Sequence, residues 1–311
     1  MASGKGIPPL VFFFLQKGAK NYDEALISAA EGGYLEIVKF MIRSGVVYYN
    51  RALIAAARGG HLDIVKLMVE LGAKDYNSTL IAAAQGGHLD IVGLMVQLGA
   101  TDYGEAMTVA ARAGYIDIIK YMLSLGATDY NRTMALAAEG GHLDIVRMIE
   151  LGATNFNWAM TMAARGGKNE MVNFFIQLGA TDYDEAMDRA AREGHLNIIK
   201  LMVELGATDF NLTMGTAAEQ GYLDIVKLMV ELGATNYDEA MKYAAGDGHL
   251  DIVKLMIELG ATNFNSAMGF AALGGYMNIV KLMIELGATN FDRAMEEAAI
   301  GDHPDIVKFR S

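Results

Sequence analysis

The chain contains no cysteine, only three prolines, and no long apolar run. The lack of cysteine excludes disulfides, thiolate metal sites and cysteine nucleophiles, and it fits a reducing compartment, so we expect an intracellular, cytoplasmic protein. The longest apolar run, Leu10–Leu15, is far shorter than the ~20 residues that a membrane span needs. No small-residue cleavage site follows it, which argues against a signal peptide. We therefore expect no role at a membrane.

Basic charge is also scarce. The 37 acidic side chains outnumber the 25 Lys and Arg side chains and give a formal net charge of −12. Binding to nucleic acid depends on neutralising phosphates, so this balance argues against a non-specific nucleic-acid binder. The apolar fraction of 53% is too high for a disordered chain, and we expect a folded protein.

The chain is rich in internal repetition. The phrase Gly-Ala-Thr-Asp/Asn-Tyr/Phe recurs every 27 residues, except for one step of 26 residues between Gly126 and Gly152. Eleven repeats fill residues 18–311, the last one truncated, and residues 1–17 form an N-terminal segment with a half-repeat cap. No linker interrupts them, so we predict one continuous array. The leading glycines are Gly18, Gly45, Gly72, Gly99, Gly126, Gly152, Gly179, Gly206, Gly233, Gly260 and Gly287.

Each repeat predicts two short helices when its leading glycine is counted as position 1. Asn or Asp stands at position 6 in every repeat except the one with Gly104, and this pattern predicts the N-cap of the first helix. Apolar residues at positions 8, 9, 12 and 13 form one helical stripe, and the Gly at position 16 ends that helix. A second amphipathic run, such as His61–Leu71, follows and ends at the next leading glycine. Helices of about ten residues are unstable alone, so they must stack into an all-α solenoid.

The run Ala-Ala-x-Gly-Gly-His-Leu-Asp-Ile-Val-Lys-Leu-Met, followed by Glu-Leu-Gly-Ala, resembles the helical core of the ankyrin repeat over nearly the whole chain. Each unit lacks about six of the ~33 residues of that repeat, at the place of its β-turn and its Thr-Pro-Leu-His tetrapeptide. The resemblance thus implies an ankyrin-like α-solenoid with shortened or absent β-hairpin fingers. The short unit is similar to ankyrin-repeat proteins of giant DNA viruses of amoebae, which implies a viral protein that acts in the host cell cytoplasm.

Histidine and methionine keep a fixed register that favours structural roles. All six histidines stand at position 17, where other repeats carry Tyr or Lys, so a series of metal sites is disfavoured. The resemblance implies that this residue joins the turns of successive repeats. Sixteen of the 21 methionines stand at positions 9 and 24, which is typical of core residues. We expect no cofactor, no metal and no catalysis. The histidines are His61, His88, His142, His195, His249 and His303.

Positions 7, 10, 11 and 14 vary most and share one face of the first helix, which in an ankyrin stack lines the concave side. We therefore predict a non-catalytic scaffold that binds a protein or peptide in this groove. A substrate-recruiting adaptor of a ubiquitin ligase is the first alternative, and a nucleic-acid binder using the central arginines is a remote one. Trp158 is the leading candidate for an anchor residue of this interface. The alternative is that its side chain folds back over a neighbouring turn. The candidate partner-binding residues are Arg112, Arg132, Trp158, Met162, Arg165, Arg189, Arg192, Tyr243 and Phe270.

Two irregularities interrupt the pattern. The 26-residue repeat is followed by an unusual turn at Lys168, so we predict a change of curvature near residues 145–175, with drift by deletion as the alternative. The apolar segment 10–15 aligns with the second helix of a half repeat but is apolar on every side. Such an end predicts packing against further structure or self-association.

Overall fold

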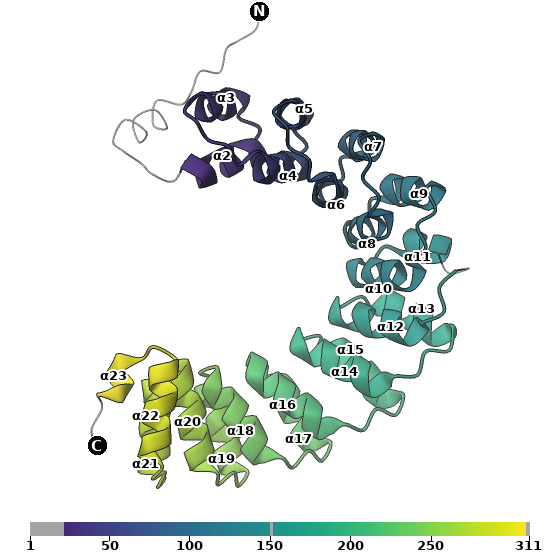
Figure 1. Ribbon diagram of the computed structural model, residues 1–311. Coiled ribbons are helices and arrows are strands. Elements are labelled where there is room, and N and C mark those ends of the chain that lie inside the picture. Colours follow the sequence, from purple (N-terminus) through teal and green to yellow (C-terminus); the bar gives the residue numbers. More distant parts are fainter. Residues whose placement is uncertain (1–21, 150–151, 309–311) are drawn as a thin grey trace, which may run out of the picture. The chain divides into compact units, whose positions relative to one another are not determined.

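The protein is described from a computed structural model that covers residues 22–149 and 152–308. These residues form 22 helices and no strand, two helices in each repeat (Figure 1). The first helices are α2 (Tyr22–Glu31), α4 (Tyr49–Gly59), α6 (Tyr76–Gly86), α8 (Tyr103–Ala113), α10 (Tyr130–Gly140), α12 (Phe156–Arg165), α14 (Tyr183–Arg192), α16 (Phe210–Gln220), α18 (Tyr237–Gly246), α20 (Phe264–Gly274) and α22 (Phe291–Ile300). The second helices are α3 (Leu35–Arg43), α5 (Leu62–Glu70), α7 (Leu89–Gln97), α9 (Ile116–Ser124), α11 (Leu143–Ile149), α13 (Asn169–Gln177), α15 (Leu196–Glu204), α17 (Leu223–Glu231), α19 (Leu250–Glu258), α21 (Met277–Glu285) and α23 (Pro304–Val307).

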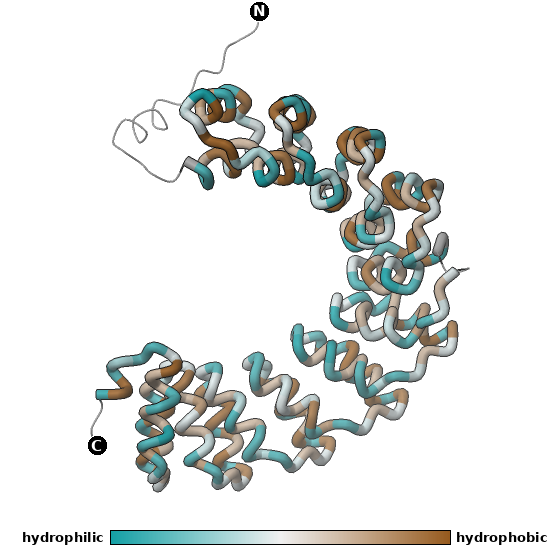
Figure 2. Tube along the Cα trace, in the orientation of Figure 1, coloured by the Kyte–Doolittle hydropathy of each residue, from teal (hydrophilic) through white to brown (hydrophobic). Residues whose placement is uncertain are grey.

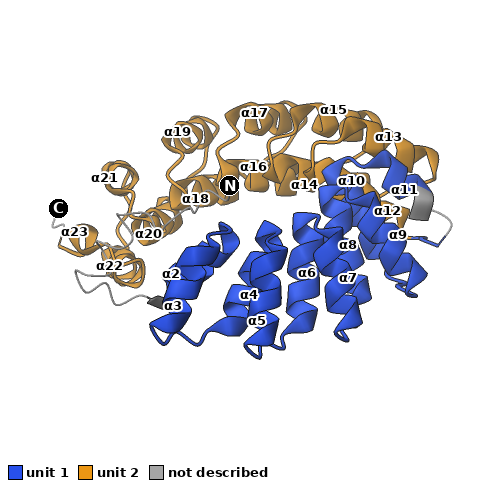
Figure 3. Cartoon of the chain, turned by 90° about the horizontal axis from the view of Figure 1, so that it is seen from above, with its two compact units in different colours: residues 1–154 blue, residues 155–311 orange. Residues whose placement is uncertain are grey.

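The chain divides into two compact units, residues 1–154 and 155–311 (Figure 3). The division falls just after the single repeat that is one residue short. The change of curvature expected near residues 145–175 stays a prediction. The apolar segment 10–15 and the self-association expected of it lie outside the described residues.

Within each unit the helices form two layers (Figure 1). First helices of successive repeats pack closely along their length, whereas second helices touch their neighbours at only a few points. Close packing is allowed by the small residues of the first helices, such as Ala52, Ala56 and Ala57 in α4, all buried. Because the first-helix layer is more tightly spaced, it lies on the inner side of the curve of each unit.

The predicted N-cap at position 6 is wrong, because the first helices begin at position 5, two residues earlier than an N-cap at position 6 implies. In the third repeat the N-cap is Asp75 at position 4, whose carboxylate accepts a hydrogen bond from the Ser78 amide at 3.3 Å. The position-6 residue Asn77 instead lies inside the first turn. Its side-chain oxygen accepts hydrogen bonds from the backbone amides of Thr101 (2.7 Å) and Asp102 (3.3 Å) in the next repeat.

This bridge from position 6 to the next repeat is a general feature of the array. Its oxygen to amide nitrogen distances lie between 2.6 and 3.4 Å. The fourth repeat carries Gly104 and has no side chain that can form it. The bridge thus connects neighbouring repeats at the start of their first helices. The other residues that form it are Asn50, Asn131, Asn157, Asp184, Asn211, Asp238 and Asn265.

The position-17 histidines join the turns of successive repeats, as expected. His61 Nε2 lies 2.9 Å from the Glu31 carbonyl oxygen of the preceding repeat. Its ring packs on Gly33, which has a φ of +74° and where a Cβ would lie 2.3 Å from the ring. The same bond is made by His88, His142, His195 and His249. Within the described residues, no group of three or more His, Cys, Asp or Glu side chains could hold a metal ion.

The repeated apolar positions form the core, and Figure 2 shows apolar residues recurring along both helix layers. The methionines at position 24 are fully buried, as in Met68, Met95 and Met256. Met268 at position 9 is likewise buried, but Met295, its equivalent in the last repeat, is 40% exposed because no described repeat covers it. The assignment of these methionines to the core is therefore confirmed away from the end. Across the described ranges, no helix is long and apolar enough to cross a membrane.

Candidate partner-binding surface

The variable positions of the first helices line two surface pockets in residues 155–311. The first pocket has a volume of about 270 Å³. Trp158 lines it and remains 37% exposed, so its ring does not lie buried beneath a neighbouring turn. Met162 also borders this pocket but is only 9% exposed, so little of it is available to a partner and its selection as a binding residue needs correction. The remaining lining residues are Asn155, Thr161, Asp182, Glu185 and Arg189.

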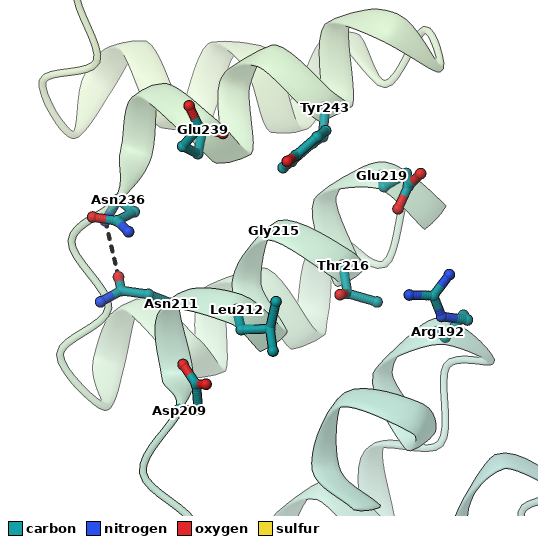
Figure 4. Close-up of a pocket in the computed structure, with 10 residues that line it drawn as sticks. All are labelled: Arg192, Asp209, Asn211, Leu212, Gly215, Thr216, Glu219, Asn236, Glu239 and Tyr243. Atoms are coloured by element: carbon teal, nitrogen blue, oxygen red, sulfur yellow. Dashed lines mark hydrogen bonds between the residues drawn. The ribbon is translucent and has the colours of Figure 1, made fainter. Parts of the chain in front are cut away.

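The second pocket, with a volume of about 590 Å³, lies along α16 and reaches α14 and α18 (Figure 4). Leu212 and Tyr243 contribute its exposed apolar surface, with 53% and 37% of each residue accessible. Gly215 leaves room between them, at a position where the first three repeats carry Ile. Its other lining residues are Arg192, Asp209, Asn211, Thr216, Glu219, Asn236 and Glu239.

Sequence reasoning selected Tyr243 and Arg192 but missed Leu212, Gly215 and Glu219. The sequence itself contains a signal for Leu212 and Gly215. Leu212 is the only aliphatic residue at position 7 in the array, and Gly215 interrupts a run of larger residues at position 10. Both departures stand in the same repeat, one helical turn apart, and together they create an apolar recess.

The predicted arginines each have a carboxylate partner. Arg112 pairs with Glu139 at 3.0 Å, and Arg165 with Glu193 at 3.8 Å, in each case with a residue of the next repeat. Arg132 forms two hydrogen bonds to Glu105 of the preceding repeat. These pairs use the cations to connect neighbouring first helices. A phosphate backbone would have to compete with the carboxylates for them, which weakens the case for nucleic-acid binding.

Arg189 and Arg192 pair within their own helix. Arg189 Nε lies 2.8 Å from Glu185, and Arg192 lies 3.9 Å from Asp188. Asp188 is buried and also accepts a hydrogen bond from the Thr216 hydroxyl of the next first helix. Asp188 therefore connects α14 to α16 and positions Arg192 at the edge of the larger pocket.

Tyr243 and Phe270 lie on either side of one lysine. The Lys242 ammonium lies 4.6 Å from the centroid of the Tyr243 ring and 5.4 Å from that of Phe270. The same ammonium pairs with Glu239. The two predicted aromatic residues are thus brought together, and both rings pack against this internal cation.

Comparison with known proteins agrees with this architecture. Residues 1–79 match the family model of ankyrin repeats in three copies. No curated protein matches the chain. The matched residues include α2, α3, α4 and α5 and only the start of α6, and the geometry of these helices recurs in the later repeats.

The described chain is an all-α, ankyrin-like solenoid without β-hairpin fingers. Only residues 71–75 connect α5 to α6, and no strand forms in the described ranges. Ankyrin repeats are generally protein–protein interaction modules and are typically non-catalytic. The two pockets on the first-helix face are therefore the natural place to look for partner contacts.

Proposed function

We propose that the chain is a non-catalytic scaffold that binds a segment of a protein partner on the first-helix face of residues 155–311. One observation carries this proposal: two neighbouring pockets on that face combine exposed apolar side chains with polar groups. Trp and Tyr dominate binding energy at protein interfaces, and here Trp158 stands in one pocket and Tyr243 in the other.

The surface suits a peptide-like partner better than a small molecule. Both pockets are open troughs, whereas small-molecule sites enclose most of their ligand. Their floors are formed by backbone and buried side chains, including Gly215 and Thr161. A partner segment that crosses several first helices would contact both pockets. Recruitment of a target to a ubiquitin ligase or other host machinery, and use by a giant virus, are finer forms of this proposal that would employ the same face.

The test is a selection of random dodecapeptides displayed on phage against the full chain, followed by titration of the selected peptides. We expect Trp158→Ala, Leu212→Ala or Tyr243→Ala to weaken binding about tenfold or more, as truncation of interface anchors does. Arg165→Glu should also weaken binding if the segment extends to the end of α12. Circular dichroism and urea unfolding must show that the variants remain folded.

Leu286→Ala serves as the matched control, because Leu286 has a similarly exposed aliphatic side chain at the end of the second helix α21. It should bind the selected peptides normally. If selected peptides tolerate all three pocket substitutions but lose affinity for the Leu286 variant, the proposed face is wrong. For the nucleic-acid alternative, affinity for single-stranded DNA would fall steeply with salt.

A further inference from the structure

The larger pocket is a trough that runs along α16. Asp209 lies at the N-cap of this helix and Glu219 in its last turn, ten residues apart, which corresponds to about 15 Å along the helix axis. Tyr243 of α18 and Leu212 of α16 lie between these ends (Figure 4). The trough is therefore long enough to hold an extended side chain of a segment that crosses α16.

The middle of the trough is apolar and open because Gly215 has no side chain to fill it. A Cβ built on Gly215 would lie 3.6 Å from ring atoms Cδ2 and Cε2 of Tyr243, so the ring lies directly over the glycine. Leu212 remains more than half exposed beside it. A row of methylene groups from a ligand would find apolar contact on both residues.

The charged groups at the trough leave it with an excess of unpaired carboxylates. The two cations at its border are already engaged, since Arg192 pairs with Asp188 and Lys242 with Glu239. By contrast, among the described residues no basic side chain lies within 4 Å of the Asp209 or Glu219 carboxylate, and the N-cap side chain of Asp209 accepts no hydrogen bond from its helix. A ligand therefore meets negative charge that the protein itself does not neutralise.

A comparison of equivalent positions locates this charge. Arg165 at position 14 pairs with Glu193 at position 15 of the next repeat, with 3.8 Å between them. Two repeats later the same two positions are occupied by Glu219 and Asp247, both acidic. Where the earlier pair of repeats has a cation and an anion, this pair has two anions, and one of them, Glu219, lines the same pocket as the Tyr243 ring. A cationic group of a partner would pair with these carboxylates as Arg165 pairs with Glu193.

We propose that the trough along α16 binds an extended segment of a protein partner through one Lys or Arg side chain. The methylene groups of that side chain lie on Tyr243 and Leu212, and its charged end meets Glu219 and Asp247. Lys and Arg fit both halves of the site because each joins an apolar stem to a cationic head. This inference rests on the proposed function, for which it names the chemistry of the partner.

The experiment compares the wild-type full chain with three variants in the dodecapeptide selection. The double variant Glu219→Gln/Asp247→Asn removes the two carboxylates with little change of shape. The control variant Glu70→Gln/Asp102→Asn removes the same net charge from residues outside the trough. Glu70 lies at the end of the second helix α5, and Asp102 is an N-cap that accepts no hydrogen bond from its helix. The variant Gly215→Ile fills the trough with a side chain that other repeats carry at this position.

We expect the wild-type chain to select peptides with a Lys or Arg next to an aliphatic residue. These peptides should bind about tenfold more weakly to the Glu219/Asp247 variant and to Gly215→Ile, and normally to the control. Replacement of the peptide's basic residue by norleucine should cause a similar loss.

Other outcomes separate the two proposals. Selected peptides that lack a basic residue but are lost on Gly215→Ile would overturn the choice of cation and leave peptide binding at this face intact. Absence of any selected peptide, or insensitivity of all of them to Gly215→Ile and to the substitutions at Trp158, Leu212 and Tyr243, would count against both. Concentration-dependent self-association in sedimentation, abolished by Glu219→Gln/Asp247→Asn, would make a second copy of the chain the occupant and would overturn the proposed partner.

Discussion

The hydrogen-bond bridge from position 6 is absent at Gly104. A substitution there can therefore measure how much this bridge stabilises the contact between neighbouring repeats. In the neighbouring repeats the position-6 oxygen accepts hydrogen bonds from two backbone amides of the following repeat, as Asn77 does from Thr101 and Asp102. The equivalent amides after Gly104 belong to Thr128 and Asp129. We predict that Gly104→Asn creates the bridge and stabilises the contact between α8 and α10.

The expected gain follows from three contributions. Two new hydrogen bonds contribute about 0.5–1.5 kcal/mol each, towards the lower end here because the site is exposed. Replacement of a glycine in a helix adds a few tenths of a kcal/mol for Asn. Against this, the new Cβ would lie 1.8 Å from Asp129 Oδ2, so that carboxylate must rotate away. It makes no N-cap hydrogen bond, and its rotation therefore costs little. We expect a net stabilisation of about 1–2 kcal/mol.

Amide hydrogen exchange reports on this bridge at the two donors. A local stabilisation of 1–2 kcal/mol slows exchange at Thr128 and Asp129 by a factor of about 5–30. The reverse substitution Asn77→Gly should accelerate exchange at Thr101 and Asp102. If Asn77→Gly leaves both of these rates unchanged, the bridge does not contribute to stability. If only Gly104→Asn fails, the displaced Asp129 carboxylate cancels the gain.

Further predictions concern the core and the turns. Met268→Ala should lower the free energy of unfolding by about 2–5 kcal/mol, whereas Met295→Ala at the equivalent exposed position should cost less than about 1 kcal/mol, as measured by urea denaturation. Equal losses would contradict the stacking derived for the last repeats. Gly60 and Gly72 both have positive φ angles, +80° and +96°, so an alanine at either costs about 1 kcal/mol of backbone strain. Gly60→Ala should destabilise more, because its Cβ would lie 2.3 Å from the His88 ring while Gly72 has open space, and a smaller loss at Gly60 than at Gly72 in thermal unfolding would refute the role of the ring.

The repeat pattern was sufficient to predict the helices, their stacking and the structural roles of methionine and histidine. Each of these features depends on residues that are close in sequence or that recur in register. The buried stripe at positions 8, 9, 12 and 13 follows from helical geometry alone. The turn at Gly60 and His61 is likewise predicted from local sequence, whatever packs around it.

The candidate site was only partly predictable. Trp158 and Tyr243 were found because large aromatic residues at variable positions are conspicuous. The pocket that makes Tyr243 accessible arises from Gly215, one repeat earlier. A search for large or charged side chains at variable positions does not select a glycine. Met162 was selected by its position in the repeat, yet it is only 9% exposed in the stacked array.

The sequence alone determined the period, the two helices of each repeat and the core, because these follow from local geometry repeated many times. Only the tertiary structure decided what the polar residues do. Position 6 looks like an N-cap in sequence, but its oxygen reaches the amides of the following repeat instead. Arg112, Arg132 and Arg165 look like free cations, but stacking brings a carboxylate of a neighbouring repeat to each. Such pairings depend on the register between neighbouring repeats, where a displacement of one residue changes every partner, and that register is set by the packing of the first-helix layer.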